Sequence, residues 1–88
     1  MKEIFLNGNN ITNIEVLENV NFPSLEVLDL SVNKIINVDV FEKVNFPKLK
    51  TLFLYKNKIS KIDKIKLKKF EYLETFAISL NERIDIIF

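Results

Sequence analysis

Cysteine and histidine are both absent from these 88 residues. Without cysteine, the chain can form neither a disulfide framework nor a thiolate metal site. Without histidine, it lacks the commonest general base and the commonest metal ligand. The single glycine, Gly8, cannot build a phosphate-cradling loop, which needs several glycines. We therefore expect no catalytic residue, no metal site, no cofactor and no enzymatic activity.

Long apolar runs are missing as well. No run approaches the roughly 18 residues that a membrane span requires. Polar residues follow too soon after Met1 for a signal peptide. The length suits one domain at most. These features predict a soluble, single-domain protein that remains in the cytoplasm.

Charge is distributed unevenly along the chain. Residues 1–44 carry three lysines against seven acidic residues, a net charge of −4. Residues 45–88 carry ten basic residues against five acidic ones, a net charge of +5. The halves are therefore complementary in sign, which permits association between copies of the chain.

Apolar residues and asparagines recur every 24 residues. Blocks that begin at residues 1, 25, 49 and 73 align without insertions. The first, fourth and sixth positions of the blocks are Met1, Leu25, Leu49 and Leu73; Ile4, Leu28, Leu52 and Phe76; and Leu6, Leu30, Leu54 and Ile78. This repetition divides the domain into repeats 1–24, 25–48 and 49–72 and a partial repeat 73–88.

The block L-x-x-L-x-L-x-x-N-x-I at residues 25–35 resembles the leucine-rich-repeat signature. Apolar pairs three residues apart, such as Ile11 and Ile14, resemble the short intracellular type of this repeat, and the resemblance covers the whole chain. It implies an α/β solenoid, a right-handed parallel coil with a four-stranded parallel sheet on its concave face. Short helical or irregular returns are expected on the convex side. The resemblance also implies a non-catalytic protein–protein interaction module.

The residue pattern supports the predicted strands independently. Apolar residues at the fourth and sixth positions alternate with polar or mixed ones, which is the period of a half-buried strand. A long return follows each strand, so neighbouring strands must run parallel.

The asparagine at the ninth position of each block lies where the chain leaves the strand. Its side-chain amide can bond backbone groups of its own turn and of the next coil. We interpret this column as a structural asparagine ladder, formed by Asn9, Asn33, Asn57 and Asn81.

The returns contain signals for short helices. Thr12-x-x-Glu15 and Ser60-x-x-Asp63 match capping boxes. Helical spacing then directs Val16 and its apolar neighbours inward. The phenylalanines at the twenty-second position are expected in the core, and they are Phe22, Phe46 and Phe70.

The concave strand face is the predicted protein-binding surface. Aromatic side chains with polar neighbours are typical of interface hot spots, although such residues also suit strands for structural reasons alone. The predicted contact residues are Phe5, Asp29, Val32, Phe53, Tyr55 and Lys56.

Two other surfaces are alternatives to this face. Carboxylate pairs such as Glu15 and Glu18 could be a hydrolytic pair or a weak Ca²⁺ site, but their recurrence favours a solvated outer face. A lysine cluster at residues 56–69 could meet an acidic partner, although a solvated convex face explains it too. Nucleic acid and membrane are not expected as partners.

Size affects the interaction hypothesis. Four strands spaced by about 4.8 Å form a sheet only about 15–20 Å wide. Its exposed patch is smaller than the roughly 800 Å² that each partner buries in a typical interface. The chain is therefore expected to resemble part of a longer array. An alternative function is structural, with copies associating end to end through uncapped ends and opposite charges.

Overall fold

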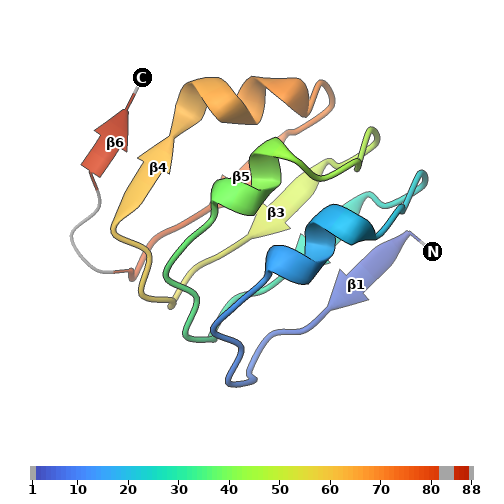
Figure 1. Ribbon diagram of the computed structural model, residues 1–88. Coiled ribbons are helices and arrows are strands. Elements are labelled where there is room, and N and C mark those ends of the chain that lie inside the picture. Colours follow the sequence, from blue (N-terminus) through green and yellow to red (C-terminus); the bar gives the residue numbers. More distant parts are fainter. Residues whose placement is uncertain (1, 82–84, 88) are drawn as a thin grey trace.

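A computed structural model describes residues 2–81 and 85–87 of the protein. Along these residues, short strands alternate with short 3-10 helices (Figure 1). In chain order the elements are β1 (Glu3–Phe5), η1 (Glu15–Asn19), β2 (Val27–Asp29), η2 (Asp39–Glu42), β3 (Thr51–Phe53), β4 (Lys61–Asp63), η3 (Lys64–Lys69), β5 (Thr75–Ala77) and β6 (Asp85–Ile87). No helix within these two ranges is long and apolar enough to cross a bilayer.

Strands β1, β2, β3 and β5 form a parallel sheet in that order. Each residue pairs with the residue 24 positions later, as Glu3 does with Val27 and Val27 with Thr51. The pairing continues beyond the strands, because the amide of Val32 donates to the carbonyl of Tyr55 at 2.9 Å. The predicted four-stranded parallel sheet is therefore confirmed, and its register equals the sequence repeat.

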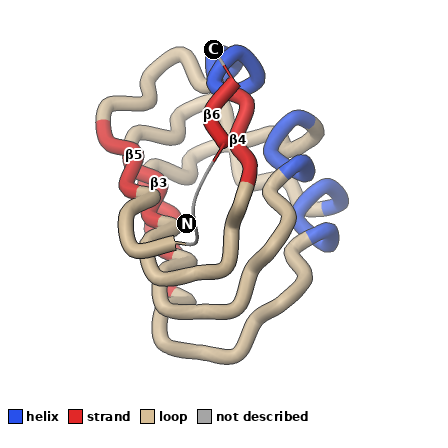
Figure 2. The backbone as a smooth tube through the Cα atoms, turned by 90° about the vertical axis from the view of Figure 1, so that its left-hand side faces the viewer, coloured by secondary structure: helices blue, strands red, loops and turns tan. Residues whose placement is uncertain are grey.

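The strands and helices occupy opposite sides of the molecule. Figure 2 shows the strands of the larger sheet along one side and the three helices along the other, with loops between them. Each return thus carries the chain across the molecule and back, which gives consecutive strands the same direction.

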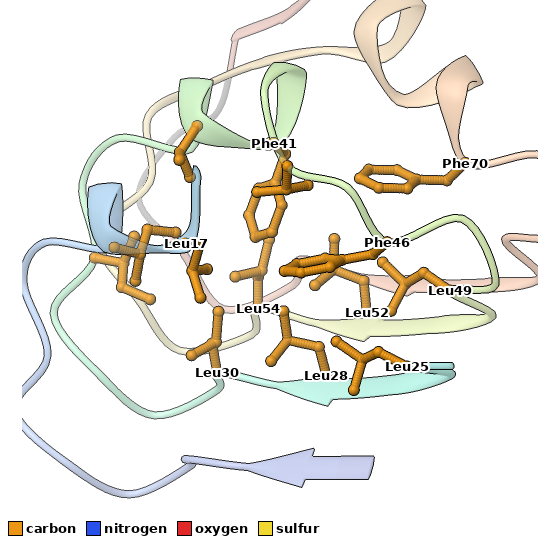
Figure 3. Packing of buried hydrophobic residues seen from close by; sticks show 14 of the residues in the cluster. Leu17, Leu25, Leu28, Leu30, Phe41, Phe46, Leu49, Leu52, Leu54 and Phe70 are labelled. Carbon is orange, nitrogen blue, oxygen red and sulfur yellow. The ribbon is translucent and has the colours of Figure 1, made fainter. Parts of the chain in front are cut away.

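The hydrophobic core fills the space between these two layers (Figure 3). Leu25, Leu28, Leu49 and Leu52 are completely buried. The phenylalanine column belongs to this core, as predicted. Phe46 and Phe70 are buried, and Phe22 stacks on Phe46 with ring centroids 5.9 Å apart.

The beginnings of the returns differ from the prediction. Helix η1 follows Ile14 and has no side-chain cap, so the capping box that starts at Thr12 is wrong. Instead, the amide of Glu15 donates to Asn13 Oδ1 at 2.8 Å. Val16 is 65% exposed rather than directed inward. This short 3-10 helix presents a narrower buried face than an α-helix does, and Leu17 occupies it.

A second, two-stranded parallel sheet was not predicted. Strand β4 pairs with β6, with Lys61 opposite Asp85 and Ile62 opposite Ile86. The two strands lie side by side at the end of the molecule opposite β1 (Figure 1). Ser60-x-x-Asp63 therefore leads through a strand before helix η3, and the second predicted capping box is wrong as well.

Candidate protein-binding face

Side chains alternate between the two faces of the four-stranded sheet, because successive strand residues point to opposite sides. Leu28 and Leu30 are 0% and 1% exposed, so they mark the side that faces the core. We call the opposite surface the outer sheet face. Its members are Glu3, Phe5, Asn7, Val27, Asp29, Ser31, Thr51, Phe53, Tyr55, Thr75, Ala77 and Ser79.

Three aromatic side chains lie on the outer sheet face. Phe53 and Tyr55 contact each other edge to face, with ring centroids 6.3 Å apart and an interplanar angle of 69°. Both are partly buried, whereas Phe5 on β1 is 58% exposed. The structure thus brings the three predicted aromatic contact residues onto one surface, where the rings remain accessible.

Asp29 differs from the exposed contact residue that was expected, because it is only 8% exposed. Strand pairing places Phe5 on one side of it and Phe53 on the other. These larger neighbours shield the shorter side chain. Its Oδ1 accepts a hydrogen bond of 2.9 Å from the amide of Ser31. A period of two indicates the face of a strand residue, but it cannot show how deeply that residue lies between its neighbours.

Val32 and Lys56 lie where the chain turns after β2 and β3. Their φ angles are both 54°, and the equivalent residues Gly8 and Leu80 have φ angles of 73° and 59°. Only glycine adopts this left-handed conformation freely, and the β-branched Val32 suits it least. Val32 and Leu80 are 41% and 69% exposed, and they lie beside the outer sheet face on either side of the coil that carries Lys56. Leu80 was not among the predicted contacts, although it occupies the same position of its repeat.

The asparagine column connects neighbouring coils. Asn57 Nδ2 donates to the carbonyl of Leu54 in its own coil at 3.0 Å and to that of Leu30 in the preceding coil at 3.1 Å. Its Oδ1 accepts a 3.0 Å bond from the amide of Ile35. Asn33 and Asn81 make the same kinds of bond. These amides satisfy backbone groups that would otherwise lie buried without partners.

The lysine-rich third return includes one lysine with a structural contact. Lys69 Nζ donates to the carbonyls of Glu42 at 2.8 Å and Val44 at 2.7 Å. Burial lowers the pKa of Lys69, while the nearby Glu42 carboxylate raises it. Four other lysines are exposed, and the side chains of residues 64 and 66 lie outside the described residues. The exposed lysines are Lys56, Lys58, Lys61 and Lys68.

Acidic residues line a groove between η1 and η2. Glu15, Glu18, Asp39 and Glu42 contribute to it together with Lys43. The Lys43 ammonium lies 3.8 Å from a Glu18 carboxylate oxygen and offsets part of the charge. Among the residues that the structure describes, no three side chains of metal-binding type are grouped as ligands.

Comparison with known protein families matches residues 1–43 to the family described as Leucine Rich repeats (2 copies). The same 24-residue spacing continues beyond the matched segment, in the pairing of β2 with β3 and of β3 with β5. The chain therefore contains leucine-rich repeats. No curated protein matches it. Domains of this family generally mediate protein–protein interactions and are typically non-catalytic.

Proposed function

We propose that the outer sheet face binds a protein partner and that the chain itself is not an enzyme. The observation that carries this proposal is the grouping of Phe5, Phe53 and Tyr55 on one accessible surface. Aromatic residues are enriched among the few side chains that supply most of the binding energy of an interface. Burying these rings against a partner would remove apolar surface from water and so favour the complex.

The charge of this surface supports a protein partner over nucleic acid or an anionic membrane. The outer sheet face carries the acids Glu3 and Asp29, and Lys56 at its rim is the one lysine of the adjoining turn positions. Binding to phosphate requires several basic groups together. The partner is therefore expected to contact aromatic and apolar side chains rather than to depend on positive charge.

The partner is also expected to extend beyond the strands. The sheet has only four strands, and a typical interface buries roughly 800 Å² on each side. Contacts to the exposed turn residues Val32 and Leu80 would enlarge the surface.

The proposal includes the shape of the coil. We propose a right-handed solenoid with the sheet on its concave side. Connections between parallel strands of one sheet are right-handed in nearly all proteins, because twisted strands pack against their return only in that hand. A crystal structure with a left-handed coil would contradict this part.

The test compares two immobilised variants with the unaltered chain in capture from cell lysate, followed by affinity measurement with the purified partner. Phe53→Ala/Tyr55→Ala removes the central rings of the outer sheet face. Tyr72→Ala is the matched control, because it removes a ring that is 56% exposed outside that face. We expect the double variant to weaken binding roughly tenfold or more and the control to leave it unchanged.

Circular dichroism must first show that all three chains are folded. If the double variant and the control bind the same partner with equal affinity, the outer sheet face is not the docking surface.

A further inference from the structure

The centre of the outer sheet face contains a carboxylate between two aromatic side chains. Asp29 on β2 pairs with Phe5 on β1 and with Phe53 on β3, and all three side chains point away from the core. The equivalent residue of the fourth strand, β5, is Ala77. A negative charge thus occurs at this level of the sheet on one strand only, with a phenylalanine on each side.

This carboxylate has no cationic partner within the described residues. It belongs to none of the ion pairs there, and its one hydrogen bond comes from the amide of Ser31. Asp29 is nevertheless 8% exposed. Removing a charge from water without a counter-charge is unfavourable, so a buried carboxylate normally has a cation beside it.

A hydroxyl group beside this carboxylate lacks a hydrogen-bond partner. Ser31 is completely buried, and its Oγ has no hydrogen bond. Ser31 is two residues beyond Asp29 on the same face of the sheet, and its amide already bonds that carboxylate. Buried hydroxyl groups are nearly always hydrogen-bonded. A carboxylate without a cationic partner and a hydroxyl without a hydrogen bond therefore lie next to each other on the outer sheet face.

We propose that this centre binds the guanidinium group of an arginine side chain presented by the protein partner. The inference rests on the docking role proposed above and specifies what the outer sheet face recognises. One guanidinium supplies a positive charge and several N–H donors, so it can pair with the Asp29 carboxylate. It can also reach the buried Ser31 hydroxyl when the neighbouring side chains move aside on binding. Phe53, held against Tyr55 at 6.3 Å, offers a ring face for the cation.

Arginine fits these groups better than the other common cations do. A lysine ammonium is a compact and strongly hydrated point charge, whereas the planar guanidinium stacks on aromatic rings and loses its hydration more easily. A calcium ion takes six to eight oxygen ligands, and one carboxylate with one hydroxyl provides too few. The 58% exposure of Phe5 leaves its ring free to close over a bound side chain.

The direct test titrates the isotope-labelled full chain with the peptide acetyl-Gly-Arg-Gly-amide and follows backbone amide signals by NMR. The neutral control peptide carries citrulline, which has nearly the shape of arginine but no charge. We expect the arginine peptide to shift the amides of Asp29, Ser31 and Phe53. The citrulline and lysine peptides should shift them much less.

Asp29→Asn is the informative variant, because asparagine retains an oxygen that can accept the Ser31 amide bond. It should weaken binding of the arginine peptide roughly tenfold or more, since hydrogen bonds to charged groups are the strong ones. Glu15→Gln removes the same charge from an exposed site on η1 and should leave binding unchanged. An unaltered spectrum of the core amides confirms that the variants are folded.

Three results would overturn the inference: equal affinity of the Asp29→Asn variant, equal binding of the citrulline peptide, or equal binding of the lysine peptide. These failures are distinct from failure of the docking role. A partner that is lost by Phe53→Ala/Tyr55→Ala but kept by Asp29→Asn would refute arginine recognition and leave the docking face in place. A partner that is kept by both variants would refute the docking face itself.

Discussion

The four-stranded sheet with the turns that follow its strands (the sheet side) and the segments that lead back to the next strand (the return side) share the 24-residue repeat. The structure is uniform from coil to coil on the sheet side and varies on the return side. Each strand of the larger sheet has three residues, and each pairs with the next at an offset of 24 residues. The first three returns contain helices of five, four and six residues. An additional strand, β4 or β6, occurs in the third and fourth returns but not in the first two. The same period in sequence therefore gives uniform structure on one side and variable structure on the other.

The kind of contact between coils explains the difference. On the sheet side, backbone hydrogen bonds and asparagine side chains join each coil to the next at fixed positions. On the return side, neighbouring coils are joined through side chains. Phe41 of η2 packs against Phe70, which follows η3, with centroids 6.4 Å apart, and Lys69 donates to the carbonyls of Glu42 and Val44. Side-chain contacts can change from coil to coil when residues are substituted, whereas backbone hydrogen bonds require the same register in every coil. Val44 is buried, whereas the equivalent Lys68 is exposed.

The largest effect is expected from the asparagine column. Asn57 is 6% exposed and bonds two coils, whereas Asn9 is exposed and bonds the carbonyls of Leu6 and Asn7 in its own turn. Asn57→Ala should lower the free energy of unfolding by about 2–4 kcal/mol and Asn9→Ala by less than about 1 kcal/mol. Urea denaturation followed by circular dichroism measures both. Equal losses of unfolding free energy would show that the hydrogen bonds between coils are not the reason for the uniform structure of the sheet side.

A smaller effect is expected on the return side, where the same position differs between two coils. Val40 in η2 is 7% exposed, whereas Val16 in η1 is 65% exposed. Val40→Ala should cost about 1–3 kcal/mol because it leaves a cavity, and Val16→Ala should change stability by less than about 0.5 kcal/mol. Thermal unfolding of the two variants provides the measurement. A large loss at Val16 would mean that the first return packs as tightly as the second.

Substitutions at the turn after the strand should change stability in opposite directions in the first two coils. Val32→Gly relieves a left-handed backbone at φ 54° and should raise the free energy of unfolding by about 0.5–1 kcal/mol. Gly8→Val imposes the same strain at φ 73° and should lower it by about 1 kcal/mol. No atom lies within 4 Å of a Cβ placed at Gly8, so crowding does not contribute there. Urea midpoints that move in the same direction for both variants would contradict this account.

The smallest effect concerns Lys69 and pH. Burial lowers its pKa below the usual 10.5, so the unfolded state binds more protons between the two values. Stability should therefore rise with pH through that window, and the unfavourable contribution is complete below the folded-state pKa. Most of the Lys69 side chain is exposed to solvent, so the change in stability with pH should be small.

Lys69→Met should remove this small rise, which is read as the change in urea midpoint between pH 7 and pH 10. Lys68→Met is the matched control, because that lysine is exposed and directly adjacent. An identical pH response in the two variants would remove Lys69 as the cause.

Much of the sheet side could be predicted from residue types alone. The leucines and isoleucines at the fourth and sixth positions identified the strands, their faces and their register, and the buried residues Leu28, Leu52 and Leu54 follow that pattern. The outer position of Phe5, Phe53 and Tyr55 follows from the same alternation. Their role in binding stays a prediction.

The return side was predicted less well. Asn13 and Asn37 recur at equal positions and accept hydrogen bonds from the amides at the start of η1 and η2, whereas the sequence pattern predicts a capping box that begins at Thr12. Strand β4 was missed because Lys61, Ile62 and Asp63 provide only three alternating residues. Short segments of this length carry too little periodicity to distinguish a strand from a helical turn.

The repeat, the parallel sheet and the core residues follow from the residue pattern, because a period of two defines the faces of each strand and a period of 24 defines the register between strands. The depth of each outward side chain depends instead on how the coils stack. Asp29 carries a charge and occupies an outward position, yet its neighbours on β1 and β3 leave it 8% exposed. Burial of this kind depends on residues 24 positions away on either side, which adjoin Asp29 only after the coils have stacked.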